Sequence, residues 1–257
     1  TVDKRKTAEW LNNLEKALAG KIPDYLVISH LEPDHSGSIG KLLEKYPDIK
    51  IISNEKVFSM FPQFVDSDIE NKKVIIKEGD TINLGRHTLQ FIMAPMVHWP
   101  EVMITYEQTE KILFSADAFG KFGVFDADEP WIDESRRYFV NIVGKYGMQV
   151  QNLLRKASDL EINTICPLHG PILKDDLSYY INLYDKWSKC EPEEDGILIV
   201  CGSLHGNTYE AAKEFEEDLK GKENKVKLID VARVPASDIV PAVSYTHLRA
   251  HETSAHL

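Results

Sequence analysis

The stretch Ser29-His-Leu-Glu-Pro-Asp-His-Ser36 places two imidazoles and two carboxylates within six residues, directly after the apolar run Tyr25-Leu-Val-Ile28. Four such side chains at the end of a buried strand repel one another or stay poorly solvated unless a cation holds them. We therefore expect His30, Glu32, Asp34 and His35 to bind metal. The alternative is a polar loop that is rich in histidine and aspartate by chance.

Patterns of helix and strand alternate on both sides of this motif. Apolar spacing predicts a helix over 7–19, a strand over 25–29 and, after the motif, a helix from 39 that ends before Tyr46-Pro47. The later strands are expected at 49–52, 73–77, a hairpin around 83–86, 88–93, 102–106, 112–114 and 162–166, and the later helices at 133–160 and 176–189. This order predicts a layered α/β fold with polar loops gathered at strand ends.

Three more candidate ligands follow hydrophobic runs at predicted strand ends: His98, Asp117 and His169. Alone, each is more typical of a hydrogen-bonded core residue than of a metal ligand. With the first cluster they make four histidines and three carboxylates. That set is large enough for two metal ions if one carboxylate bridges them.

A second region begins after the acidic stretch 191–196. A strand over 196–201, a loop over 202–208, a helix over 209–220 and a strand over 225–231 form the opening of a doubly wound sheet. Residues 243–257 resemble the in-frame translation of a sequencing-library adapter, and we exclude them from fold reasoning. We therefore predict a first domain over 1–191 and the start of a second domain over 195–242. We interpret residues 243–257 as a sequencing-adapter artefact.

The motif H-x-E-x-D-H, read here at 30–35, together with the three later residues, resembles that of the flavodiiron proteins. This family joins a metallo-β-lactamase-like αββα sandwich to a flavodoxin-like domain. The resemblance implies that His30, Glu32 and His98 hold one iron, that Asp34, His35 and His169 hold the other, and that Asp117 bridges them. It spans about residues 7 to 240 and indicates a fragment truncated at both ends.

Glu32 separates two reaction types. Hydrolytic relatives of this fold have a second histidine at that position, which suits zinc and an activated water. A carboxylate there makes the ligand set harder and more anionic and favours iron. We therefore expect an oxidoreductase that reduces dioxygen to water, nitric oxide to nitrous oxide, or both. One alternative is a zinc metallohydrolase acting on an ester, thioester or phosphodiester. The other is an electron carrier or an inactive binding protein whose metal site is vestigial.

Four-electron reduction of dioxygen needs a second electron store, and FMN meets that need. The loop over 202–208 offers hydroxyls, backbone N–H groups and a helix amino terminus to a phosphate. It resembles the flavodoxin phosphate loop, and its candidate FMN-binding residues are Ser203, Leu204, His205, Gly206, Asn207 and Thr208. Tyr146 is a candidate for a proton or hydrogen bond close to the metal ligands. Trp99 and Pro100 either line the flavin-facing side of the pocket or belong to the core.

The family resemblance also implies a head-to-tail homodimer or tetramer and an electron donor such as rubredoxin or a reductase. The net charge is −11, and no basic run interleaves with aromatic residues, which argues against a nucleic-acid partner. No apolar run reaches membrane-spanning length and no signal peptide is evident, so a cytoplasmic location is expected.

Overall fold

The computed structural model describes residues 1–124, 130–191, 193, 196–221 and 225–234. The chain divides into two compact units, one of Thr1–Ala118 with Asn152–Leu177 and one of Phe119–Gln151 with Ser178–Leu257. The predicted domain boundaries between 191 and 195 and at 242 remain predictions, and the adapter-like residues 243–257 lie outside the described residues.

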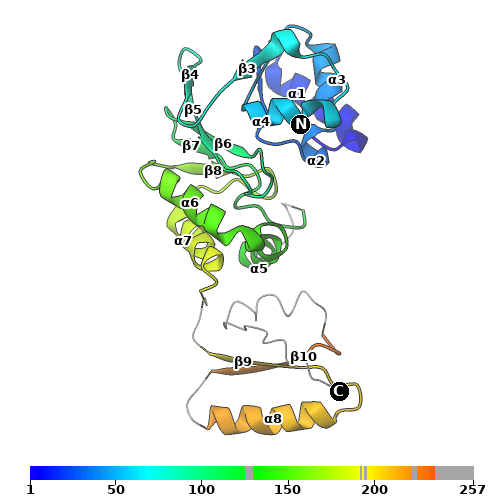
Figure 1. Cartoon of the computed structure of the whole chain (residues 1–257), viewed down its shortest axis with the longest axis vertical. Helices are drawn as coiled ribbons and strands as arrows, with labels where there is room; N and C mark the ends of the chain where they lie inside the picture. The colour runs from blue at the N-terminus through cyan, green and yellow to red at the C-terminus, as the bar shows by residue number, and fades with distance from the viewer. Residues whose placement is uncertain (125–129, 192, 194–195, 222–224, 235–257) are drawn as a thin grey trace. The chain divides into compact units, whose positions relative to one another are not determined.

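The first unit contains a parallel sheet in the order β1-β2-β3, formed by Tyr25–Val27, Lys50–Ser53 and Lys73–Ile75. Three helices, α1 (Thr7–Leu18), α3 (Ile39–Lys45) and α4 (Glu55–Met60), gather around it in Figure 1. The helix α1 packs Trp10, Leu11 and Leu14 against buried residues of this core, as its apolar spacing predicts. Asn54 caps α4 by accepting a hydrogen bond from the Val57 N–H.

A second sheet in the same unit has the order β4-β5-β6-β7-β8. Its strands are Thr81–Asn83, Thr88–Met93, Met103–Glu107, Ile112–Phe114 and Thr164–Cys166. The first four pair antiparallel, and β8 joins β7 in parallel. Ile52 of β2 and Met103 of β6 belong to one buried cluster, and the Met103 N–H donates to the Ser29 carbonyl. This contact places the end of β1 beside the second sheet.

The second unit begins where the sequence predicts helices, at about 133–160. The structure has α5 (Trp131–Tyr138), a π turn (Phe139–Val143), a 3₁₀ turn (Gly144–Tyr146) and α6 (Gly147–Ala157), which crosses the border between the units. A Cβ atom at Gly147 would lie 2.2 Å from the carbonyl oxygen of Ser188, at the end of α7 (Leu177–Ser188). The break therefore permits a close backbone approach that only glycine allows.

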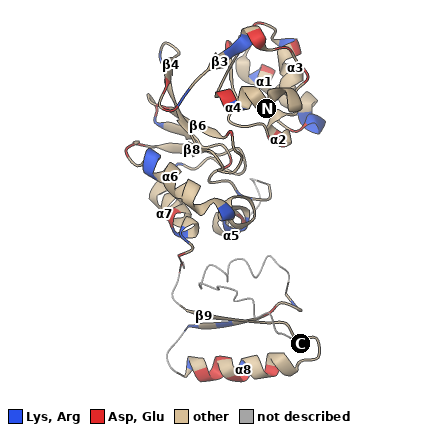
Figure 2. Ribbon diagram, in the orientation of Figure 1, with Lys and Arg blue, Asp and Glu red and all other residues tan. Residues whose placement is uncertain are grey.

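The strands β9 (Ile197–Cys201) and β10 (Val226–Asp230) are parallel and joined by α8 (Asn207–Lys220), which packs on both. Acidic residues recur along α8 in Figure 2. This is the strand, helix and strand unit that the sequence predicts. No helix among the described residues is long and apolar enough to span a membrane.

Candidate metal centre

The histidine-rich motif leaves β1 and turns at once into the single-turn helix α2 (Pro33–Ser36). Pro33 stands at the first helical position, where its fixed φ suits a helix start and its missing N–H costs nothing. The Leu31 side chain is fully buried in the core, so the residues on either side of it, His30 and Glu32, are held close to that core. Pro33 and the burial of Leu31 therefore both help to position the backbone of the motif.

Asp117 is presented by a tight turn after β7. The Ser115 hydroxyl donates to the Ala118 carbonyl at 2.7 Å, and Ala116 adopts a φ of 52°. The Asp117 residue is only 1% exposed. His98 lies in the loop between β5 and β6, and His169 in the loop after β8, so residues far apart in sequence come from neighbouring strand ends.

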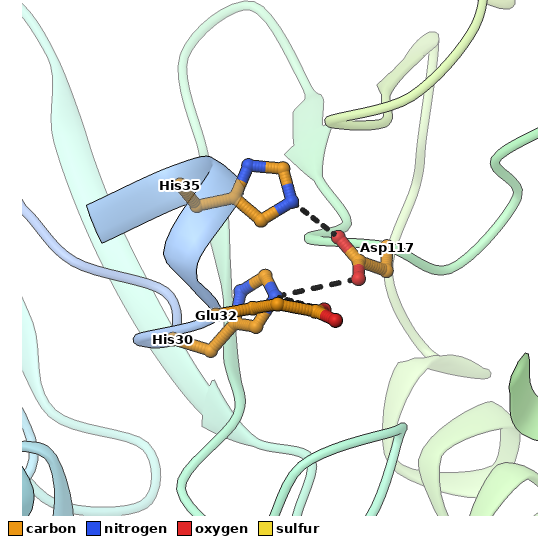
Figure 3. Close-up of side chains that lie close together, drawn as sticks. All are labelled: His30, Glu32, His35 and Asp117. Carbon is orange, nitrogen blue, oxygen red and sulfur yellow. Dashed lines mark ion pairs between the residues drawn. The ribbon is translucent and has the colours of Figure 1, made fainter. Parts of the chain in front are cut away.

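One oxygen of Asp117 faces two histidines. Asp117 Oδ2 lies 3.3 Å from His30 Nε2 and 3.0 Å from His98 Nε2. Glu32 Oε2 completes this group at 2.9 Å from His98 Nε2 and 3.6 Å from His30 Nε2. Figure 3 shows the carboxylates of Glu32 and Asp117 both directed toward His30.

The other oxygen of Asp117 faces a different pair. Asp117 Oδ1 lies 3.3 Å from His35 Nε2 and 3.9 Å from His169 Nε2, and Figure 3 shows the His35 contact. Asp34 Oδ2 is 3.4 Å from His35 Nε2 and 3.3 Å from His169 Nε2. The two histidine nitrogens are 3.0 Å apart. The seven side chains thus form two groups of three that share Asp117.

The charges of the metal-free cluster are strongly coupled. Burial lowers the pKa of His30, but the carboxylates of Asp117 and Glu32 outweigh it and raise this pKa to about 9. The same balance raises the pKa of His98 to about 9. His30 and His98 in turn lower the pKa of Glu32 to about 2. Burial raises the pKa of Asp117, yet three neighbouring histidines hold it far below its ordinary value.

The arrangement fits a pair of cations. Donor atoms bound to one ion at about 2.1 Å lie about 3 Å apart, which is the spacing seen here. Among the described residues, four buried atoms of the cluster have no hydrogen-bond partner: His30 Nδ1, His30 Nε2, Asp34 Oδ1 and Asp117 Oδ1. Buried polar atoms without partners carry a desolvation cost that a cation would remove. Imidazole with carboxylate suits iron, and no described thiol belongs to the candidate groups.

The other predicted residues have less direct structural support. The Trp99 ring lies 6.5 Å from the rings of both His30 and His98 and 5.6 Å from Phe64, so it covers one side of the cluster. Tyr146 belongs to the second unit, where its ring lies 4.9 Å from Lys145 Nζ, and its role stays a prediction. Of the predicted flavin loop, Ser203 to Gly206 lie between β9 and α8, whereas Asn207 and Thr208 are the first residues of α8, which begins two residues earlier than predicted.

Sequence reasoning missed Glu101. This residue is 2% exposed and accepts a hydrogen bond from the Leu31 N–H at 3.1 Å. The sequence carried one signal: Glu101 directly precedes the apolar run Val102-Met-Ile104, which marks a buried strand, and acidic residues are rarely buried without a specific partner. Only the fold shows that its partner is a backbone group inside the histidine-rich motif.

Comparison with known proteins places these observations in a family. The pattern of the ODP family β-lactamases matches residues 6–170. An uncharacterized protein of Methanocaldococcus jannaschii is 33% identical over 91% of this chain and 61% of its own length. A Moorella thermoacetica protein named nitric oxide reductase is 31% identical over 86% of this chain and 57% of its own length. The chain thus spans little more than half the length of these relatives.

Two solved structures share the fold. The flavodiiron protein of Giardia intestinalis is 26% identical, with a TM-score of 0.82 over 94% of this chain and 61% of that one. The rubredoxin oxygen:oxidoreductase of Desulfovibrio gigas is 27% identical, with a TM-score of 0.80 over 95% of this chain and 63% of that one. The predicted mixed α/β fold is therefore confirmed. The chain belongs to the ODP family of β-lactamases, and its sequence and fold match those of flavodiiron proteins.

Proposed function

We propose that this chain carries the diiron centre of a flavodiiron oxidoreductase that reduces dioxygen to water, nitric oxide to nitrous oxide, or both. The division of the cluster by the two oxygens of Asp117 carries this proposal. A single carboxylate that faces two groups of three donors is what a bridged metal pair requires. The names of the Moorella and Desulfovibrio relatives, which mention nitric oxide and oxygen, support the reaction class.

Each residue has a defined task in this proposal. His30, Glu32 and His98 hold one iron, and Asp34, His35 and His169 hold the other. Two irons held together would supply electrons to a small diatomic gas. Glu32 favours iron over zinc at the first position because its charge stabilises the ferric form. Trp99, whose ring lies 6.5 Å from the rings of His30 and His98 and packs against Phe64, would limit the access of water to that side of the cluster.

We further propose that the loop of Ser203, Leu204, His205, Gly206, Asn207 and Thr208 binds the phosphate of FMN, as the start of a flavodoxin-like domain. The Ser203 N–H donates to Asp230 Oδ1 at 3.1 Å, and the Gly206 N–H donates to the Ser203 hydroxyl at 3.0 Å. The Ser203 hydroxyl proton therefore remains available to a phosphate oxygen. The α8 amino terminus adds the positive end of its dipole.

The partners and the location follow from the same proposal. We propose a rubredoxin or a reductase as electron donor, supported by the rubredoxin named in the Desulfovibrio relative. A homodimer or tetramer would bring the flavin of one subunit to the iron pair of the next. A cytoplasmic location and the absence of a nucleic-acid partner remain part of this proposal.

The decisive experiment measures metal, flavin and gas consumption together on the purified natural protein. We expect two irons and one FMN per subunit, and flavin oxidation that depends on dioxygen or nitric oxide. Two zinc ions with ester, thioester or phosphodiester hydrolysis and no flavin would replace this function with the hydrolase. Iron binding without turnover of either gas would instead indicate an electron carrier.

A further inference from the structure

A buried carboxylate links the two loops that carry the first group of three donors. Glu101 lies three residues after His98, and its Oε1 accepts a hydrogen bond of 3.1 Å from the N–H of Leu31, which stands between His30 and Glu32. One side chain therefore ties the His98 loop to the motif. Its carboxylate bonds to the backbone of the motif and not to the side chain of a proposed ligand.

The side chain, the carbonyl and the N–H of Leu31 are each fixed by a contact. Its side chain is fully buried in the core, and its carbonyl accepts a hydrogen bond from the Ser36 hydroxyl at 2.8 Å. Its N–H is held by Glu101. Because His30 and Glu32 flank this fixed peptide, their Cα positions cannot shift without breaking one of these contacts.

Glu101 is itself anchored. Its backbone carbonyl accepts a hydrogen bond of 2.8 Å from Asn54 Nδ2, and the other end of the Asn54 amide caps α4. Glu101 thus joins the start of α4, through its backbone carbonyl, to the motif, through its carboxylate. Burial of a carboxylate with one hydrogen bond is costly, and Glu101 Oε2 has no partner among the described residues.

We propose that Glu101 is a positioning residue that sets the spacing of His30, Glu32 and His98 and thereby the affinity of their metal position. This inference rests on the proposed diiron centre. It distinguishes the two metal positions, because Glu101 holds the peptide between His30 and Glu32 and follows His98 by three residues, and these three side chains form one group. Residues that orient metal ligands typically alter metal affinity by about 10- to 100-fold when changed.

The test is a Co²⁺ titration of the metal-free protein, followed by absorbance. Glu101→Met keeps the volume but removes the acceptor, and we expect one of two binding steps to weaken by about 10- to 100-fold while the other is unchanged. Glu101→Gln keeps an acceptor oxygen for Leu31 and should restore both steps. If the Met variant is insoluble, Glu101→Asp, which withdraws the carboxylate by one methylene, should show the same selective loss.

Glu107 provides a matched control at the other end of β6. It is also buried, and its carboxylate accepts backbone N–H groups of Thr109 and Glu110 at 2.9 and 2.6 Å. Glu107→Met should lower the thermal midpoint and leave both Co²⁺ steps unchanged. Two unaltered steps in the Glu101→Met protein, or equal weakening of both, would overturn the inference. A wild-type protein with fewer than two steps would instead contradict the proposed diiron centre.

Discussion

Glu32 Oε2 lies 2.9 Å from His98 Nε2, although 66 residues separate the two in sequence. This contact joins the motif at the end of β1 to the loop between β5 and β6, on the side of the cluster that Asp117 Oδ2 faces. Glu32 also distinguishes this cluster from a hydrolytic site, because hydrolases of this fold carry an imidazole where this chain has the Glu32 carboxylate. We therefore expect metal choice to depend on Glu32.

Replacement of Glu32 by histidine should move the site toward zinc. The Glu32→His protein, offered equal iron and zinc, is expected to contain mainly zinc and to lose at least about tenfold in gas-dependent flavin oxidation. Metal content by mass spectrometry checks this result. Glu44→His, which removes an exposed partner of Lys41 on α3, serves as control and should retain iron. A Glu32→His protein with unchanged iron content would show that this carboxylate does not select the metal.

Loss of the bridge should affect both metal positions. Asp117→Asn keeps the shape, but one oxygen becomes an NH₂ group, which cannot bind a cation. We expect bound iron to fall from two per chain to one or none. Asp185→Asn removes a comparable charge on α7, where Asp185 accepts from Lys189 and Gln151, and should keep two irons. Retention of both irons in Asp117→Asn would argue against a bridging role.

The metal-free protein should lose stability as the pH rises from about 6.5 to 9. His30 and His98 have pKa values near 9 in the folded cluster against 6.5 for an ordinary histidine. A raised folded-state pKa contributes stability that is complete below pH 6.5 and is lost as the pH passes through 9. Urea midpoints of the metal-free protein over this range measure the effect. The affinity for metal should show the opposite slope, because the bound imidazoles must be neutral.

Gly147→Ala should destabilise the second unit by about 1–3 kcal/mol, because its Cβ would lie 2.2 Å from the Ser188 carbonyl oxygen. Gly144→Ala, whose Cβ would meet nothing closer than 3.5 Å, is the matched control. The latter should be neutral or slightly stabilising, since alanine favours helix. Equal denaturation midpoints for the two variants would contradict the close approach of α6 to α7.

The strands and the clustering of the candidate metal-binding residues could be predicted from the sequence. Short apolar runs precede His98, Asp117 and His169 and indicate buried strands. A polar side chain at the end of such a run can be recognised from the sequence alone. The positions at which the helical region over 133–160 is interrupted could not be predicted, because Gly147 approaches Ser188, which is distant in sequence. Glu101 was missed for the same reason, since its partner is a backbone N–H that no side-chain pattern records.

The most direct test of the central claim is the metal content and Mössbauer spectrum of the purified natural protein loaded with ⁵⁷Fe. Six side chains arranged in two groups around a shared Asp117 predict two irons per chain, magnetically coupled because one carboxylate joins them. A single uncoupled iron, or a protein that takes up two zinc ions in preference to iron, would contradict the account.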